Sequence, residues 1–276
     1  MTTNHTSFSV LMSVYRDETA DHVRTALKSV FDQTIPPDEV LIVEDGPLPV
    51  NLKEVITSFK RQYPDTVQII SLSTNRGLGV ALRVGVEACS NDLIARMDAD
   101  DVAVETRFQD QLAYLSANPE IDVLGGYVME FSRDPNESGQ IREVPVDPER
   151  VRSFARFRCP VNHPTVMFRR EAVLEAGNYR SFRSMQDYEL WMRMLSQGHT
   201  IANLPTVLVK CRTGNDLFDR RGGLRYARTE IRIQHEFLKH SSVSPVVFLL
   251  NIVARIPLRL TPNVVRKRVY QSILRS

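Results

Sequence analysis

The stretch Leu93–Asp101, LIARMDADD, places three carboxylates directly after a short apolar run. The apolar run predicts a buried strand over Leu93–Met97, with Asp98, Asp100 and Asp101 at its carboxyl end. Mutual repulsion makes such a cluster costly unless a cation or hydrogen-bond donors compensate it. Oxygen-only ligands favour Mg²⁺ or Mn²⁺, and the alternative is a solvated acidic loop.

Short apolar runs alternate with helical patterns on both sides of this stretch, which is typical of βαβ units. The expected strands are Phe8–Val14, Val40–Val43, Val67–Leu72, Leu93–Met97, Ile121–Phe131 and Thr165–Phe168. The expected helices are Thr19–Gln33, Val50–Gln62, Gly79–Cys89, Val104–Ala117, Gln186–Leu195 and Leu224–His240. The pattern predicts an α/β fold with a mixed, mostly parallel sheet flanked by helices, followed by a C-terminal helical appendage.

Three polar segments follow strands of this predicted sheet, at Asp45, Asn75–Gly79 and Asp98–Asp101. In open α/β sheets ligands bind at the carboxyl ends of the strands, so these segments are expected to line one crevice. The Gly-rich segment lacks the third glycine of a dinucleotide fingerprint, because Leu82 stands there. Its Arg76 is a candidate for contact with a diphosphate, and a plain strand-to-helix connection is the alternative.

Asp187 and the single tryptophan, Trp191, are four residues apart and would share one face of a helix. A carboxylate beside an aromatic platform suits a sugar acceptor, because partial desolvation makes the carboxylate a better general base towards a hydroxyl. The alternative is that Trp191 belongs to the core and that Asp187 faces the helix dipole.

Three further residues are weaker candidates for contact with an acceptor or a phosphate. His163 precedes a predicted strand, although a lone histidine is more often structural. Arg220 and Arg221 lie in a polar loop from which a guanidinium pair could bind phosphate in bidentate fashion. A solvated charge pair is the alternative for the two arginines.

Composition limits the classes of function. The 276 residues are 42% hydrophobic and 25% charged, as in an ordinary globular protein of one large domain, or of a domain with an appendage. The net charge of +2 argues against a nucleic-acid partner. The charge is uneven, because Ser241–Ser276 contains six basic residues and no acidic residue.

Cysteine usage and the termini bear on location. Cys89, Cys159 and Cys211 form no C-x-x-C pair, and the N-terminus lacks a secretory signal, so a reducing, cytoplasmic location is expected. The apolar stretch Pro245–Leu260 is interrupted by arginines and falls short of a membrane span. With the basic tail it could lie on a membrane surface, or it could pack on the body of the protein as part of a helix pair.

Taken in order, these motifs resemble the family-2 glycosyltransferases, which are inverting enzymes of the GT-A fold. The resemblance covers Phe8–Arg212. Ser9–Tyr15 looks like the opening strand of that family and Val43–Gly46 like its base-binding turn. Asp98–Asp100 is similar to its D-x-D motif, and Gln186–Trp191 to its Glu-Asp and Trp motif.

The resemblance implies a role for each matching residue. Ser13 and Asp45 would contact the nucleotide base, and Asp98 would face the ribose or the donor sugar. Asp100 would bind Mn²⁺ or Mg²⁺ at the donor diphosphate, and Asp187 would be the general base that deprotonates the acceptor hydroxyl. The resemblance also implies a catalytic domain at residues 1–212 and a basic helical region at 213–276.

More narrowly, Arg96–Asp101, Asn162–Thr165 and Arg221–Gly223 look like segments of the enzymes that assemble bacterial O-antigen, capsule and exopolysaccharide. The similarity extends to the β-1,3-galactosyl- and glucosyltransferases that act on N-acetylglucosamine-diphosphate-undecaprenol. It implies a UDP-hexose donor, a polyprenyl-diphosphate-linked sugar acceptor, and a peripheral position on the inner face of the cytoplasmic membrane.

Three alternatives stay open at this point. A sugar-1-phosphate nucleotidyltransferase would need a Gly-rich N-terminal loop, and Thr2–Tyr15 contains no glycine. An inactive sugar- or nucleotide-binding module at the membrane would not need the carboxylates that are present. A glycosyltransferase could also act on a soluble or protein acceptor.

Overall fold

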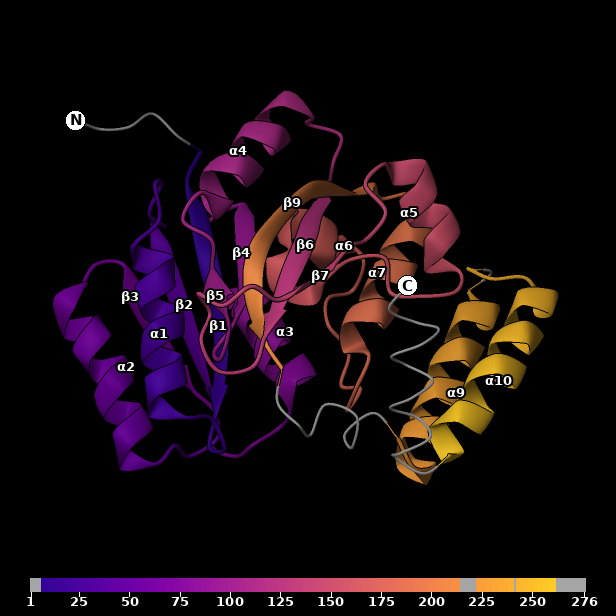
Figure 1. Ribbon diagram of the computed structural model, residues 1–276, viewed down its shortest axis with the longest axis horizontal. Coiled ribbons are helices and arrows are strands. Elements are labelled where there is room, and N and C mark those ends of the chain that lie inside the picture. The colour runs from indigo at the N-terminus through magenta and orange to yellow at the C-terminus, as the bar shows by residue number, and fades with distance from the viewer. Residues whose placement is uncertain (1–5, 214–221, 241, 262–276) are drawn as a thin grey trace.

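The computed structural model describes residues 6–213, 222–240 and 242–261, and within them nine strands form one sheet (Figure 1). The strands are β1 (Phe8–Tyr15), β2 (Glu39–Asp45), β3 (Val67–Ser71), β4 (Leu93–Asp98), β5 (Val102–Ala103), β6 (Val123–Phe131), β7 (Gln140–Arg142), β8 (Met167–Arg169) and β9 (Ile201–Arg212). The helices are α1 (Ala20–Phe31), α2 (Val50–Gln62), α3 (Leu78–Ala88), α4 (Arg107–Ala117), α5 (Pro148–Ala155), α6 (Arg170–Glu175), α7 (Gln186–Ser196), α9 (Leu224–Lys239) and α10 (Pro245–Leu260), with a 3₁₀ turn, η1, at His163–Thr165.

The sheet has a parallel half and a mixed half. The strand order is β3-β2-β1-β4-β8-β6-β9-β5, with β7 paired to β6. The first four strands in this order run parallel, as expected for strands joined through helices. Beyond them, β8 runs antiparallel to both β4 and β6, and β9 runs parallel to β6. The predicted α/β class with a mixed sheet is therefore observed.

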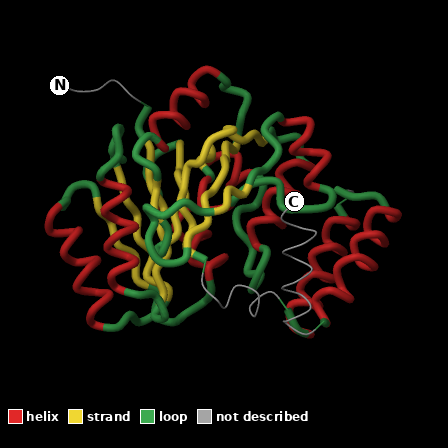
Figure 2. The backbone as a smooth tube through the Cα atoms, in the orientation of Figure 1, coloured by secondary structure: helices red, strands yellow, loops and turns green. Residues whose placement is uncertain are grey.

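Helices cover both faces of the sheet (Figure 2). Strand β1 alternates its side chains, so that Phe8, Val10 and Met12 pack with α1, α2 and α4 on one face. Leu11 points to the other face, where the core includes residues of α3, α6, α7 and α9. The result is a three-layer arrangement in which the carboxyl ends of β1, β2 and β4 meet at one edge.

Several elements differ from the sequence-based expectations. The segment Ser132–Glu149, to which the sequence pattern assigns no helix or strand, contains β7 and the start of α5. The strand expected at Thr165–Phe168 is split into η1 and β8. Strand β9 was not anticipated, and it pairs along most of β6 while its end also holds β5. Such short or long-range strands depend on pairing partners distant in the sequence, which local patterns do not reveal.

The C-terminal helices α9 and α10 lie side by side at the end of the molecule away from α1 and α2 (Figure 1). Helix α9 packs against α7, where the Phe237 ring lies 4.9 Å from that of Tyr188. Among the described helices, none is long and apolar enough to cross a membrane. The predicted domain division between residues 212 and 213 stays a prediction.

Candidate active site

The carboxyl ends of three parallel strands bring the expected donor-side residues together. In the register of β1 and β4, Ser13 is paired with Asp98. In the register of β1 and β2, Tyr15 is paired with Asp45. Because parallel neighbours end at the same edge of a sheet, the three predicted residues Ser13, Asp45 and Asp98 lie at one edge.

Asp45 organises the Gly-rich turn. Its buried carboxylate accepts hydrogen bonds from the backbone N–H of Arg76, at 2.7 Å, and of Gly77, at 2.9 Å. Gly46 follows with a φ of +88°, and a Cβ there would lie 2.5 Å from the backbone nitrogen of Asn75. The end of β2 and the Gly-rich turn are therefore in close contact. The side chain of Arg76 is exposed.

Gly79 joins this turn to the helix that bears Asp187. A Cβ at Gly79 would lie only 2.5 Å from the carbonyl oxygen of Arg180 and 3.5 Å from Cβ of Gln186. The absence of a side chain therefore permits close contact between the start of α3 and the segment that leads into α7. Two segments more than one hundred residues apart in sequence meet here, on the two sides of the candidate site.

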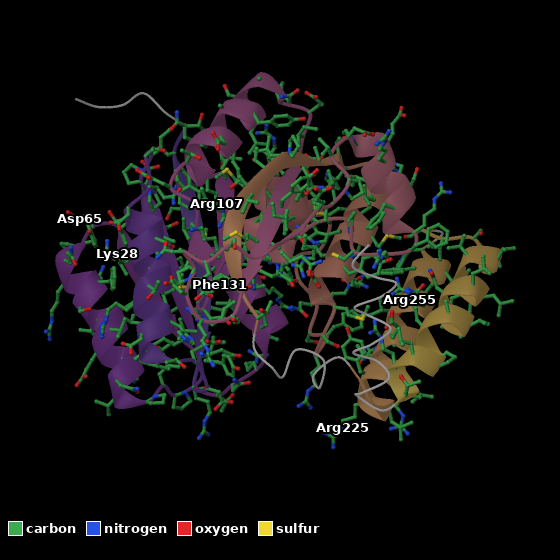
Figure 3. The ribbon with its side chains drawn as sticks, in the orientation of Figure 1. Lys28, Asp65, Arg107, Phe131, Arg225 and Arg255 are labelled. Atoms are coloured by element: carbon green, nitrogen blue, oxygen red, sulfur yellow. The ribbon has the colours of Figure 1, made fainter. Side chains whose placement is uncertain are left out.

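Asp98 is held by a buried arginine. Both guanidinium Nη atoms of Arg96 bond to the carboxylate of Asp98, and the side chain of Arg96 is 3% exposed. The fully buried Arg107, which Figure 3 labels, donates to the backbone carbonyl of Arg96 at 2.7 Å and to Gln111 at 3.1 Å. A bidentate pair of this kind fixes the orientation of the carboxylate as well as its charge.

The three carboxylates of the acidic stretch converge. One oxygen each of Asp98, Asp100 and Asp101 lie within 4.8 Å of one another. Burial, followed by repulsion from Asp98, raises the pKa of Asp100 to about 6 and that of Asp101 to about 8. Asp101 also accepts a hydrogen bond from the backbone N–H of Arg212 at 2.8 Å.

These three carboxylates fit a hard divalent cation, because they offer only oxygen ligands. A bound cation would also relieve the repulsion between their negative charges. Asp98 is engaged by Arg96 and Asp101 by the backbone of Arg212. Asp100, which is partly exposed, is therefore the carboxylate best placed to reach a bound ion.

Asp187 lies in the first turn of α7 and is partly exposed. The thiol of Cys159 donates to its Oδ2 across 3.8 Å. Burial raises the pKa of Tyr179 above its usual range; Arg96 opposes this, while the charges of Asp187 and Asp98 add to it. The Tyr179 hydroxyl is therefore within electrostatic reach of both the proposed base and the acidic cluster.

Two predicted acceptor contacts belong to the interior instead. Trp191 is 0% exposed, so the expectation of an open aromatic platform is corrected: its ring packs edge-on to His163 and Tyr179. His163 is also buried, and its Nε2 lies 2.9 Å from the Tyr179 hydroxyl. Burial, together with the charge of Arg96, holds the pKa of His163 well below its usual value, so its ring is neutral at pH 7.

The sequence reasoning missed three residues that support the site. Arg96 orients Asp98, and the Tyr179 hydroxyl is under the electrostatic influence of both Asp98 and Asp187. Arg212 braces the acidic stretch through its backbone N–H to Asp101. A charged residue inside the apolar run LIARM was the available signal for Arg96. The predicted Arg220 and Arg221 lie outside the described residues.

Comparison with known proteins finds a family whose model matches this chain. The model of the family described as "Glycosyl transferase family 2" matches residues 9–177. The chain is 36% identical to the amylovoran biosynthesis glycosyltransferase AmsE of Erwinia amylovora, over 96% of this chain and 98% of that one. It is 34% identical to the UDP-Gal:alpha-D-GlcNAc-diphosphoundecaprenol beta-1,3-galactosyltransferase of Escherichia coli, over 97% of this chain and 96% of that one.

Solved structures show the same architecture. A mannosyltransferase of Pyrobaculum calidifontis, PcManGT, in complex with GDP-Man and Mn²⁺, superposes with a TM-score of 0.68 over 98% of this chain and 76% of that one. The two sequences are 15% identical, so this likeness concerns the fold, which is the GT-A fold.

Proposed function

Because the chain belongs to glycosyl transferase family 2, we propose that it is a metal-dependent, inverting transferase that moves galactose or glucose from a UDP-sugar to a lipid-diphosphate-linked sugar. Its similarity over nearly the whole chain to two bacterial polysaccharide glycosyltransferases supports the class of reaction. The observation that carries the proposal is an oxygen-only acidic cluster whose Asp98 acts, together with Asp187, on the buried hydroxyl of one tyrosine, Tyr179.

In this proposal the donor binds along the carboxyl ends of β1, β2 and β4. Ser13 and Asp45 would contact the base of the nucleotide, and Arg76, on the turn that Asp45 holds, would contact the diphosphate. Asp98, kept in position by Arg96, faces the ribose or the donor sugar. A Mn²⁺ or Mg²⁺ ion held by Asp100 would neutralise the charge that develops on the departing diphosphate.

Asp187 acts as the general base. Its carboxylate accepts the proton of the acceptor hydroxyl while that oxygen forms a bond to the anomeric carbon of the donor. The bond from the anomeric carbon to the diphosphate oxygen breaks on the opposite face, and UDP leaves with that electron pair. Attack from the opposite face inverts the anomeric centre, so an α-linked donor gives a β-linked product.

The lipid-linked acceptor and a position on the cytoplasmic face of the membrane are further parts of the proposal. They are supported by the relative whose name specifies a diphosphoundecaprenol acceptor. The donor hexose is not distinguished by any motif, since galactose and glucose differ in the orientation of one hydroxyl.

The test is transfer from a panel of UDP-sugars to a synthetic N-acetylglucosamine-diphosphate-lipid, with Mn²⁺, with Mg²⁺ and with EDTA, and with products resolved by mass. We expect one donor to give a metal-dependent product one hexose heavier than the acceptor. Metal-dependent hydrolysis of one donor without transfer would overturn the acceptor and keep the transferase. The absence of both transfer and donor hydrolysis would favour an inactive binding module.

A further inference from the structure

Helix α10 lies at the end of the molecule (Figure 1), and its exposed side chains are aliphatic. Its exposed side chains recur at the i, i+3, i+4 and i+7 spacing of one helical face. The large ones are between 51% and 68% exposed, and they are Val246, Leu249, Leu250, Val253 and Leu260. The other exposed residues of the helix, Pro245, Ala254 and Pro257, are apolar as well. This aliphatic face of α10 therefore offers no side-chain hydrogen-bonding group to water.

The polar side of the same helix is turned inward and fixes its orientation. Arg255 and Arg259 both pair with Glu230 of α9, which is 0% exposed, and Arg259 Nε lies 2.7 Å from its Oε2. The amide of Asn251 donates to Gln234 at 3.0 Å. Rotating α10 to bury its aliphatic face would leave Glu230 buried without its two cations, which is strongly unfavourable. The outward position of the aliphatic face is thus built into the hairpin.

The neighbouring helix α9 presents cations on its outer side. Arg225, Arg228 and Lys239 are exposed, and Arg225 lies at the N-terminal end of the helix, at the bottom of the view in Figure 3. Only two residues of α9 are acidic. Glu230 is buried in its ion pairs, and Glu236 pairs with an arginine and a histidine. The exposed charges of the hairpin formed by α9 and α10 are therefore basic.

We infer that this hairpin docks the protein on an anionic lipid surface. The aliphatic face of α10 would lie at the boundary between headgroups and acyl chains, and the exposed cations of α9 would meet lipid phosphates. The inference rests on the proposed function, because a lipid-linked acceptor places the reaction at a bilayer. It identifies the hairpin of α9 and α10 as the part of the protein that contacts the lipid. This hairpin is connected to the candidate site through Phe237 of α9, whose ring contacts Tyr188, the residue after Asp187.

Charge complementarity favours a bilayer over a second copy of the chain. A twofold contact through the aliphatic faces would bring the basic surfaces of two hairpins near one another, which is unfavourable. Anionic headgroups complement those surfaces instead. The sequence after Thr261 adds four more basic residues and no acidic one, namely Arg266, Lys267, Arg268 and Arg275.

The experiment is co-flotation of the full chain with vesicles of phosphatidylethanolamine alone or mixed with phosphatidylglycerol. We expect binding to the anionic vesicles and at least tenfold weaker binding by the triple variant Leu249→Ser, Leu250→Ser, Val253→Ser. The matched control is Val50→Ser on α2, an aliphatic residue that is 73% exposed on another part of the surface. Its binding should equal that of the wild type. Thermal unfolding of each variant shows whether the fold is kept.

Two outcomes overturn the inference: wild-type protein that stays at the bottom of the gradient, or a folded triple variant that floats as the wild type does. If the wild type does not bind vesicles and the triple variant differs from it only in oligomeric state, measured by sedimentation, the aliphatic face of α10 contacts a second copy of the chain instead.

Transfer to a short-chain, water-soluble acceptor separates this inference from the proposed function. The triple variant should keep that transfer and lose transfer to acceptor embedded in vesicles. Failure of the wild type on the soluble acceptor would refute the acceptor named in the proposed function, whatever the vesicle experiment shows.

Discussion

Replacing Gly79 by alanine should separate the two halves of the active site without touching a proposed catalytic group. The new Cβ would lie 2.5 Å from the carbonyl oxygen of Arg180, whereas ordinary contact begins near 3.4 Å. The neighbour is backbone and cannot rotate away, so α3 and the segment before α7 must move apart by about 0.9 Å, the difference between these distances.

The expected consequence is a loss of rate larger than the loss of stability. A displacement of about 1 Å at reacting groups costs on the order of 10²-fold in rate. Overpacking costs about 1–3 kcal/mol, and the better helix propensity of alanine returns roughly 1 kcal/mol. We therefore expect the free energy of unfolding of Gly79→Ala to lie within about 2 kcal/mol of that of the wild type. We expect its kcat to fall by about two orders of magnitude.

The assay is steady-state transfer, with kcat and KM measured separately, beside denaturant unfolding of the same preparations. Gly85→Ala is the matched control, because Gly85 lies in the same helix and its Cβ would meet Leu11 of the core at 2.2 Å. It should lose stability and keep kcat under conditions in which it is folded. Transfer by Gly79→Ala within twofold of the wild type, or equal losses in both variants, would refute the reasoning.

Four further predictions concern acidic groups. Asp187→Asn should bind the donor as the wild type does, by calorimetry, and lose about 10²–10⁴ in kcat; wild-type turnover would disprove its role as base. Asp100→Ala should abolish the metal dependence of donor binding, and a preserved Mn²⁺ requirement would exclude it as a ligand. The raised pKa values of Asp100, about 6, and Asp101, about 8, mean that protons compete with the metal, so Mn²⁺ affinity should rise from pH 5.5 to 8.5. Without metal, the same shifts predict that the free energy of unfolding falls as the pH rises from 5.5 to 8.5, because the folded protein loses protons that the unfolded chain has already released. A Mn²⁺ affinity and a free energy of unfolding that do not change with pH would contradict these two predictions. Glu230→Gln should destabilise the protein by about 3 kcal/mol in urea unfolding, since its two arginine partners are left without their anion.

The parallel half of the fold was readable in advance because its signals are local. The helix predicted at Val50–Gln62 has those bounds in the structure, and the predicted strands at Phe8–Val14 and Leu93–Met97 are each one residue longer. Apolar runs that end in acidic or glycine-rich turns mark such strands whatever they pair with. The mixed half offered no such signal, because β9 is defined by its partner β6 across a long stretch of chain.

The candidate site divides in the same way. Asp45, Asp98, Asp100 and Asp187 could be named from motifs, and the family assignment that the motifs suggested is confirmed. Their roles stay predictions. Trp191 could not be placed, because helical spacing shows that two side chains share a face and not whether that face meets solvent or the core.

The sequence by itself determined the chemistry that is available: a run of carboxylates after an apolar strand, a further carboxylate on a helix, and a basic C-terminal segment. Only the tertiary structure decided which of these groups are near one another and which are covered. Arg96 reaches Asp98 because alternate residues of a strand share one side, and Gly79 admits Arg180 because glycine has no side chain there. The aliphatic face of α10 points outward because Glu230 holds the opposite side of that helix. Proximity and burial arise from contacts between distant segments, and no local pattern encodes them.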